Sequence, residues 1–436
     1  MIEDSARPPR SLYAWYVVAV LILAYTLSYV DRSILTLMVA PIRASLHISD
    51  VQLSLLHGLA FAIFYTIMGI PIGRLVDQRR RTGIVAVGVG LWSLATAACG
   101  FAGSFATMFA ARIGVGVGEA ALSPAAYSML ADQFEGKRLV RALSFYQSAI
   151  YLGPAIATLA GGVLLGHLTP LDTAIGHFEP WQLVFILVSL PGLAVALLVL
   201  TLREPARRGT GGQADAPPFR AVLRRVADHK GAYGLLILGL CFQSVMWNGA
   251  AAWIPTHFMR SYGWTPNQVA WGYGPAIAIA GTCGGVFGGW LAGRMRDKGL
   301  RDANIRIGVI AALTALPFIV AAPLMPTAES SLALVACFLF CGAMPYGGAA
   351  AAFQEITPNR MRGQVSAIYL FWLNLAGIGL GSTIVALATQ HLFGGDLGVG
   401  RAIATVAGLS ASLSAVTLML CLAPYRRAMD RAGILK

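Results

Sequence analysis

Long apolar runs alternate with short polar breaks along the whole of this chain. Each run is long enough to cross the hydrocarbon core of a bilayer as a helix, which takes about 20 residues at a rise of about 1.5 Å per residue. We therefore predict twelve transmembrane helices. The first six are expected at residues 13–42, 52–73, 83–103, 106–130, 139–167 and 181–202, and the second six at 231–260, 268–293, 305–325, 329–354, 363–391 and 399–424.

One polar break is much longer than the others. It runs from Arg203 to Lys230, reads "REPARRGTGGQADAPPFRAVLRRVADHK", and is rich in Gly, Pro and Arg. This composition is typical of a linker. The pattern predicts an N-terminal six-helix bundle at 1–202, a linker at 203–230 and a C-terminal six-helix bundle at 231–436. Within the linker, "FRAVLRRVA" is expected to form a short helix on the membrane surface.

Composition supports an all-α integral membrane protein. Hydrophobic residues make up 57% of the chain and charged residues only 12%, whereas soluble domains carry about 25% charged residues. The net charge of +13 does not indicate nucleic-acid binding, because the basic residues are spread over short loops and form no basic domain. The six cysteines lie in apolar segments without a CxxC pair, so we expect neither a metal site nor a disulfide framework.

The distribution of Lys and Arg predicts the orientation of the chain. If both termini are cytoplasmic, all but five of the 32 Lys and Arg residues fall in cytoplasmic segments. This bias is typical of multi-pass proteins, and we expect the protein in the plasma (inner) membrane. The five exceptions are Arg32, Arg43, Arg112, Arg260 and Arg401.

Two segments of the chain repeat after about half its length. "GRLVDQRRR" begins at Gly73 and "GWLAGRMRDKG" begins at Gly289, each after a predicted helix. A second pair, "KRLVRALS" and "NRMRGQVS", supports the same repeat. Two halves of like topology are therefore predicted, and repeats of this kind place a substrate site between the halves, near mid-membrane.

The first of these loops resembles the loop signature of the major facilitator superfamily. In that signature a Gly allows close helix packing, an Asp sits at a helix end and basic residues follow. This copy departs from it, with Gln78 where a basic residue is usual and Arg80 where a second Gly is usual. The resemblance implies the major facilitator fold, with two pseudo-symmetric bundles, and a cytoplasmic gate. The candidate gate residues are Gly73, Asp77, Arg81, Gly289 and Arg294.

A narrower resemblance comes from the first and fourth predicted helices. "YVDRSILTL" together with "RIGVGVGEAALSPAAYSML" is similar to the Spinster family. In that family the first-helix Asp-Arg and the fourth-helix Glu line the central cavity, and its members include exporters of sphingosine 1-phosphate and of lysophospholipids. Proton coupling has been proposed for some of them. The Asp-Arg pair also resembles that of symporters for sugar acids, so both substrate classes stay open.

Four charged residues lie deep in predicted spans: Asp31, Arg32, Arg112 and Glu119. A charge at the bilayer centre costs about 3 kcal/mol or more, so such residues face the protein interior or water and usually pair. Arg112 and Glu119 are seven residues apart and share one face of a helix. Asp31 and Arg32 point about 100° apart, so one can face a cavity while the other braces a neighbour. A purely structural ion pair remains an alternative.

These charges suggest how transport could be coupled to protons. We expect Asp31 and Glu119 to titrate, and Arg32 and Arg112 to bind the substrate. When the phosphate or carboxylate of a substrate binds one of these arginines, the protein carboxylate loses its countercharge and accepts a proton more readily. Polar and aromatic residues that could complete the cavity are Tyr127, Tyr146, Gln147, Tyr151, Gln243, Trp247, Asn248, Tyr369 and Asn374.

Together these features predict a secondary active transporter that works by alternating access. We expect a monomer that moves an amphipathic anion, such as a lysolipid or a sphingosine phosphate-like molecule, with protons. Alternatives are a proton-coupled symporter of a small organic anion such as a sugar acid, a multidrug exporter, and a membrane enzyme or lipid scramblase. The chain has no HExxH, GxSxG or Walker motif, so we expect no enzyme and no cofactor. It also offers no ring of like charges for a channel.

Overall fold

Helices form nearly all of the chain in the computed structural model, which describes residues 11–174, 176–205, 207, 218–358 and 361–432. Within these residues, 12 helices are long and apolar enough to cross a membrane. The prediction of an all-α, twelve-helix membrane protein is therefore confirmed. The centre of the predicted linker lies outside the described residues, and the boundaries 1–202, 203–230 and 231–436 stay a prediction.

The N-terminal half contains the first six spans, several of them broken in mid-membrane. The first span is α1, and a 3-10 turn connects it to α2; a π-helical turn joins α3 to α4 in the second span. The helices are α1 (Ser11–Ser33), α2 (Val39–Leu46), α3 (Asp50–Ser54), α4 (Ala60–Gln78), α5 (Arg81–Gly100), α6 (Phe105–Glu119), α7 (Leu122–Gln133), α8 (Gly136–Gln147), α9 (Ala149–His167) and α10 (Pro180–Leu200).

A short antiparallel hairpin of β1 (Leu171–Thr173) and β2 (Gly176–Phe178) connects the fifth and sixth spans, with Asp172 opposite His177. The C-terminal half contains the other six spans and the linker helix α11. Its helices are α11 (Phe219–Asp228), α12 (Lys230–Tyr262), α13 (Pro266–Ala276), α14 (Thr282–Asp297), α15 (Ala303–Ala321), α16 (Ala328–Ala343), α17 (Tyr346–Ile356), α18 (Arg362–Asn374), α19 (Ser382–Leu387) and α20 (Val399–Ala432).

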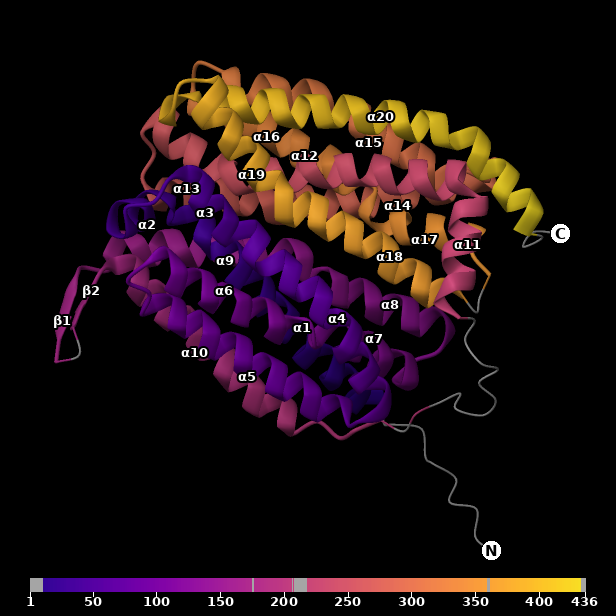
Figure 1. Cartoon of the computed structure of the whole chain (residues 1–436), viewed down its shortest axis with the longest axis horizontal. Coiled ribbons are helices and arrows are strands. Elements are labelled where there is room, and N and C mark those ends of the chain that lie inside the picture. The colour runs from indigo at the N-terminus through magenta and orange to yellow at the C-terminus, as the bar shows by residue number, and fades with distance from the viewer. Residues whose placement is uncertain (1–10, 175, 206, 208–217, 359–360, 433–436) are drawn as a thin grey trace, which may run out of the picture.

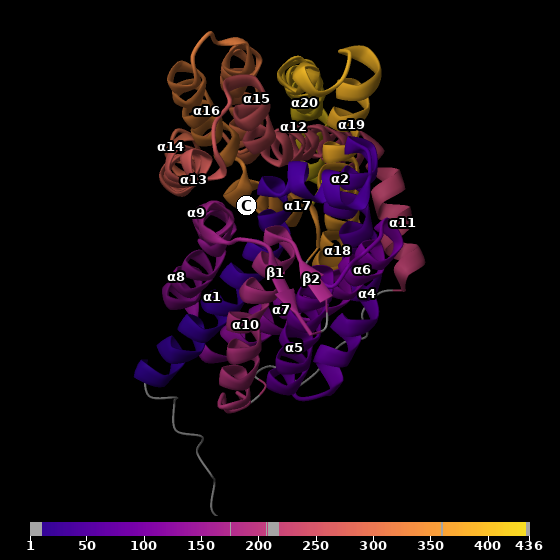
Figure 2. The ribbon, with the colours of Figure 1, turned by 90° about the vertical axis from the view of Figure 1, so that its left-hand side faces the viewer.

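The helices gather into two groups that lie side by side, one from each half (Figures 1 and 2). The β-hairpin projects from one end of the spans, while α11 lies at the opposite end (Figure 1). We call these ends the hairpin side and the linker side. Under the predicted orientation, the linker side is cytoplasmic.

Glycines in the fourth span allow its neighbours to approach closely. A Cβ atom on Gly116 would lie 2.7 Å from the Phe61 carbonyl oxygen, and one on Gly118 would lie 2.6 Å from the Trp92 amide nitrogen. Only a residue without a side chain tolerates such contacts. Because Phe61 is on the second span and Trp92 on the third, these glycines bring both helices against the fourth, where Glu119 ends α6.

Ion pairs hold the helices of each half together on the linker side. In the N-terminal half, the fully buried Arg81 pairs with Asp132 and donates from Nε to Glu204 at 2.7 Å. In the C-terminal half, Glu355 pairs with Arg296 and accepts a hydrogen bond from Tyr425 at 2.6 Å. These contacts join the ends of several helices within one half. They therefore strengthen each half as a unit.

Contacts between the halves are concentrated on the hairpin side. Among the side chains that the structure describes, the hydrogen bonds and ion pairs between the halves lie on this side. The N-terminal half contributes α2 and α3, and the C-terminal half contributes the end of α12, the start of α19 and the loop at Asp396. Closely fitted glycines add to this contact, since a Cβ on Gly58 would lie 2.3 Å from the Ile378 carbonyl oxygen. The halves are thus closed together on the hairpin side.

Candidate transport site

The centre of the site is an ion pair between the first and fourth spans. Arg32 donates from Nε to Oε2 of Glu119 at 2.6 Å, and the Ser28 hydroxyl donates to the same oxygen at 2.6 Å. Ser28 lies one helical turn before Arg32, so both side chains leave the same face of α1. The other carboxylate oxygen of Glu119 is buried and has no hydrogen-bond partner among the described residues. Glu119 therefore has a free acceptor in the protein interior.

Three aromatic rings surround the Arg32 guanidinium. Its central carbon lies 4.8 Å from the ring centre of Tyr29, 4.5 Å from that of Phe61 and 4.9 Å from that of Tyr65. Ring faces attract cations, so this cage holds the guanidinium in place. The Arg32 side chain keeps 13% of its surface exposed, while the Glu119 side chain keeps none. Arg32 is therefore the member of the pair that a solute can reach.

Asp31 and Arg112 lie behind this pair, deeper in the N-terminal half. Asp31 is 3% exposed and Arg112 is fully buried. Arg112 donates from Nη1 to the backbone oxygen of Asp31 at 3.1 Å and from Nε to the backbone oxygen of Leu56 at 3.2 Å. Its Nη2 is buried without a partner among the described residues. Arg112 thus braces the backbone of the first and second spans, and its contact with substrate stays a prediction.

Aromatic residues continue from the cage toward the linker side. Tyr29 meets Tyr25 edge-on, and Tyr25 stacks flat on Tyr146 with ring centres 4.4 Å apart. Tyr127 meets Tyr146 edge-on at 5.6 Å and is 39% exposed. Two predicted cavity residues, Tyr127 and Tyr146, are thus brought into one aromatic column with the Arg32 cage. Tyr25 and Tyr146 are buried, so Tyr127 is the exposed member of these three rings.

The remaining N-terminal candidates differ in position. Gln147 is half-buried, and its side-chain oxygen has no partner among the described residues. Tyr151 is buried and its ring lies against Gly281 of the C-terminal half, where a Cβ would be 2.7 Å away. Tyr151 is therefore part of the contact between the halves.

The C-terminal candidates do not form one cluster. Trp247 packs against Phe338 and Tyr346, with ring centres 5.9 and 5.7 Å away. Asn248 donates to the backbone of Ser244 one turn earlier, at 3.0 Å. The other three candidates lie apart from these: Asn374 is half-buried, Tyr369 is buried and stacked on Phe353, and Gln243 is buried with its amide donating to the Gly308 backbone.

The predicted cytoplasmic gate has four candidate residues whose side chains or backbone the structure describes: Gly73, Gly289, Arg81 and Arg294. A Cβ on either Gly73 or Gly289 would meet nothing within 4 Å. Arg81 pairs inside its own half, and Arg294 lies over the Trp290 ring at 5.5 Å. The side chain of the fifth candidate, Asp77, lies outside the described residues. None of the four described residues joins the two halves here.

A network of charges joins the halves on the hairpin side. We call it the hairpin-side latch, made of Arg43, Asp50, Arg260 and Asp396. Arg260 of the C-terminal half donates to Asp50 of the N-terminal half at 2.7 and 2.8 Å, and Arg43 donates to both oxygens of Asp396 at 3.0 Å. Each half therefore supplies one acid and one base.

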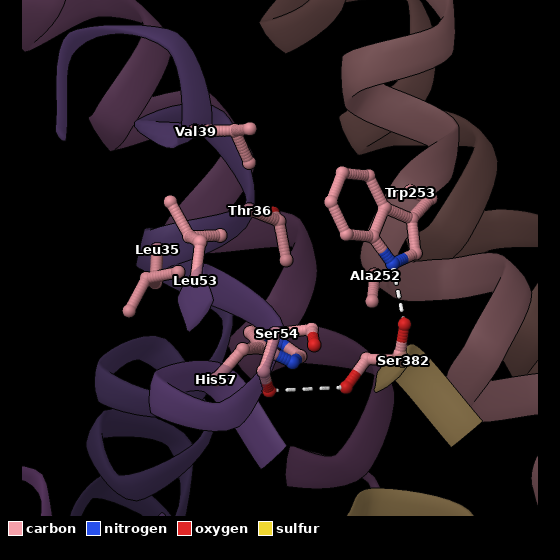
Figure 3. A pocket seen from close by; sticks show the side chains of 9 residues that line it. All are labelled: Leu35, Thr36, Val39, Leu53, Ser54, His57, Ala252, Trp253 and Ser382. Carbon is pink, nitrogen blue, oxygen red and sulfur yellow. Dashed lines mark hydrogen bonds between the residues drawn. The ribbon is translucent and has the colours of Figure 1, made fainter. Parts of the chain in front are cut away.

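Beneath the latch, residues of both halves line one small cavity (Figure 3). Here Trp253 donates to the Ser382 backbone at 2.9 Å, and the Ser382 hydroxyl donates to the Ser54 backbone at 3.4 Å. The cavity that these residues share with His57 has a volume of about 10 Å³, close to the ~10–15 Å³ that one water needs. This side of the molecule is therefore sealed against a solute.

Comparison with known proteins now identifies the family. The model of the Major Facilitator Superfamily matches residues 21–382, which is most of the chain. The chain belongs to the Major Facilitator Superfamily. Its relatives and fold are those of transporters, as the sequence predicted, and not of enzymes.

The chain is similar to three curated relatives of different names. It is 28% identical over 425 residues to an MFS-type efflux pump of Mycolicibacterium smegmatis, covering 95% of this chain and 94% of the relative. It is 30% identical over 255 residues to the human Protein spinster homolog 1, covering 56% and 46%. It is 24% identical over 339 residues to a probable L-galactonate transporter of Escherichia coli, covering 74% and 71%.

Solved structures agree with the Spinster resemblance. The chain matches a bacterial homolog of the human lysosomal transporter Spinster, in an inward-facing and unoccupied conformation, with a TM-score of 0.76 and 26% identity, over 97% of this chain and 98% of that one. It also matches a D-xylose-proton symporter with a TM-score of 0.67, at 16% identity, which shows the fold alone. The chain is thus a superfamily transporter that resembles Spinster.

For this superfamily member, sequence reasoning missed the cage and the latch. Tyr29 is three residues before Arg32, a spacing that puts both on one helix face, so it could have been found. Phe61 and Tyr65 gave no such signal. Arg43 and Arg260 are two of the five basic residues outside the predicted cytoplasmic segments, and that exception is the available signal for the latch. His57 was missed because one polar residue in an apolar run is common.

Proposed function

We propose that this chain is a proton-coupled secondary transporter for an amphipathic anion. The observation that carries the proposal is the position of Arg32: it is bonded to Glu119 through Nε, caged by aromatic rings, and still partly exposed. Among the described residues no hydrogen bond engages its two terminal nitrogens. Those nitrogens suit bidentate contact with a phosphate or carboxylate.

Competition for Arg32 would link the substrate to the proton. While Arg32 is bonded to Glu119, the carboxylate is stabilised in its charged form. An anion bound to Arg32 weakens that contact and leaves Glu119 with Ser28 as its remaining hydrogen-bond partner. A buried carboxylate without a countercharge is costly, so Glu119 then accepts a proton. Asp31, buried close to Arg112, is the second candidate for the proton.

The surroundings of Arg32 favour a substrate with an apolar tail. The aromatic column of Tyr25, Tyr146 and Tyr127 extends from the cage, and its exposed member, Tyr127, would contact the hydrocarbon chain of such a substrate. The resemblance to Spinster, which appears in both comparisons, supports this class, because that family is expected to include exporters of lysophospholipids. Exchange between a state closed on the hairpin side and a state closed on the linker side would complete alternating access.

A small organic anion is the second candidate. Its support is that relatives of this chain include a probable L-galactonate transporter and a D-galactonate transporter, both of Escherichia coli. Arg32 would bind the carboxylate of such a sugar acid in the same way. In that case the aromatic column would have no role in substrate binding.

Transport by purified protein in liposomes tests both candidates. A pH gradient is imposed, and uptake of a labelled anionic lysophospholipid is compared with uptake of labelled galactonate. We expect gradient-driven transport of the lysophospholipid. Faster transport of galactonate would favour the second candidate, and failure of the gradient to drive either would exclude proton coupling.

Glu119→Gln tests the coupling step itself. The amide cannot take up and release a proton, so we expect this variant to lose gradient-driven transport while it still exchanges substrate across the membrane. Glu329→Gln makes the same chemical change at an exposed position and should behave as wild type. Unchanged pH dependence in Glu119→Gln would refute the role of Glu119.

A further inference from the structure

The linker helix α11 (Phe219–Asp228) has two different apolar edges. Val222 is fully buried and packs with Tyr233 in the core of the C-terminal half. Phe219 and Leu223, one turn apart, are 55% and 46% exposed. The first edge fixes the helix to the protein. The second is left uncovered by every part of the chain that the structure describes.

Two arginines lie beside the uncovered edge. Arg220 and Arg224 are also one turn apart, and each follows one residue after a member of the apolar pair, about 100° further round the helix. Both are exposed. Among the described residues, neither has a hydrogen bond or an ion pair. The helix thus presents two large apolar side chains next to two unpaired cations.

The place of α11 in the fold puts this surface at the membrane boundary. Only His229 separates it from α12, which begins the seventh span at Lys230. Figure 1 shows α11 running across the direction of the spans at their linker-side end. Figure 2, which looks along the spans, places α11 at the outer edge of the molecule beside α18. Hydrocarbon and lipid headgroups therefore lie next to it.

We propose that the exposed face of α11 docks onto anionic phospholipids of the linker-side leaflet, with Phe219 and Leu223 in the hydrocarbon and Arg220 and Arg224 on the phosphates. Four observations agree with this partner: the exposed apolar pair, the unpaired arginines beside it, the crosswise direction of the helix, and its level at the start of a span. Amphipathic helices of this composition bind in the interface, and anionic lipids strengthen the attraction.

This docking is independent of the proposed substrate. Because Val222 fixes α11 to the C-terminal half and α12 continues directly from it, the lipid contact would tie that half to one leaflet. The N-terminal half has no such described helix at its edge. Alternating access would then involve movement of one half relative to the other, with the C-terminal half held at the surface.

Depth measurement on the full-length protein in nanodiscs tests the proposal. The six native cysteines are replaced by Ser, and a nitroxide is attached at Leu223→Cys. Collisions with oxygen report immersion in lipid, and collisions with a nickel chelate report exposure to water. We expect an immersed label in phosphatidylcholine that contains phosphatidylglycerol. In phosphatidylcholine alone, the ratio of docked to undocked helix should fall.

Removal of either arginine should reproduce the loss of anionic lipid. We expect Arg220→Gln and Arg224→Gln each to lower the docked-to-undocked ratio about fivefold in the phosphatidylglycerol nanodiscs. Arg401→Gln removes the same charge at an exposed position on the hairpin side and should change nothing. A label that reaches water in both lipids would overturn the proposal. A label that is buried in both lipids would also overturn it, since that would indicate a protein partner. An equal fall of the docked-to-undocked ratio in Arg401→Gln would overturn it as well.

Discussion

Arg260 in the C-terminal half donates hydrogen bonds of 2.7 and 2.8 Å to the two carboxylate oxygens of Asp50 in the N-terminal half. Both side chains are largely removed from solvent, at 12% and 5% exposure. Two-point contact between a guanidinium and a carboxylate is strong and depends on geometry. A transporter that opens on the hairpin side must break this contact, so it sets part of the difference in free energy between the two states.

Loss of Asp50 should therefore favour opening on the hairpin side. In Asp50→Asn the amide cannot balance Arg43 and Arg260, and removal of one member of a buried pair costs about 2–5 kcal/mol. Even about 2 kcal/mol moves an equilibrium roughly 30-fold. Spin labels at the exposed His47 and Leu397, one on each half, should report a longer distance in the variant.

The matched control for this prediction is Arg401→Gln. Arg401 is also a cation on the hairpin side, but it is exposed and outside the latch, so the distance distribution should match wild type. A distribution in Asp50→Asn that matches wild type as well would mean that the latch does not set the equilibrium.

Arg32→Lys should weaken substrate binding although it keeps the charge. Lys lacks the planar fork that contacts two oxygens at once, and it fits less well among Tyr29, Phe61 and Tyr65. A contact worth about 1–2 kcal/mol would be lost, which raises the KM for transport by roughly tenfold. Initial rates of uptake over a range of substrate concentrations provide the measurement. Equal KM values would show that only the charge of Arg32 matters.

Gly58→Ala should also favour opening on the hairpin side, in this case through a steric clash. The added Cβ would lie 2.3 Å from the Ile378 carbonyl oxygen and 2.9 Å from that of Gly379, so the backbones of the two halves must separate. Overpacking of this kind costs about 1–3 kcal/mol. The label pair at His47 and Leu397 should again report a longer distance.

Gly69→Ala is the control in the same span. A Cβ at Gly69 would meet nothing within 4 Å, so this variant should keep the wild-type distance. If Gly58→Ala and Gly69→Ala gave the same distribution, the close fit at Gly58 would not hold the hairpin side closed.

Asp302 should make stability depend on pH. It lies at the N-cap position of α15, and its carboxylate accepts hydrogen bonds from Arg306 at 2.8 Å and from Arg426 at 2.7 Å. Burial by itself raises the pKa of Asp302, but the hydrogen bonds from the two arginines outweigh it and hold the pKa below its usual range. The stabilisation is then complete above the unfolded pKa of about 4 and is lost as the pH falls through the folded value.

Asp302→Asn should lower the free energy of unfolding by about 1–3 kcal/mol at neutral pH. The difference from wild type should shrink once the pH falls below about 4. Thermal melts of the detergent-solubilised protein at a series of pH values measure both effects. Asp297→Asn, at an exposed position on the same side, should melt as wild type at every pH. A constant gap between Asp302→Asn and wild type would contradict the assigned pKa direction.

Much of the fold could be read from the order of residues alone. Helices in a bilayer must bond their own backbone groups and be apolar over about 20 residues, so the twelve spans appear in the sequence without knowledge of tertiary contacts. The cost of a charge in hydrocarbon likewise singled out Arg32 and Glu119, because a residue so costly to bury needs a partner. Their direct contact at 2.6 Å agrees with that reasoning.

The choice of partners was decided only by the tertiary structure. Periodicity along one helix cannot say which neighbour a side chain meets. Arg112 donates to the backbone of Asp31 and Leu56, two contacts that no pattern in the sequence indicates, and its contact with substrate stays a prediction. Phe61 and Tyr65 join the Arg32 cage through the packing of the second span. The latch needs residues hundreds of positions apart, such as Arg43 and Asp396, to meet at 3.0 Å.

Sequence thus determined where the chain crosses the membrane and which charges require a partner, because both follow from the energy of placing a group in hydrocarbon. The structure alone decided which partner each charge found and which side of the molecule is closed. Those depend on how two halves, far apart in the chain, pack against each other.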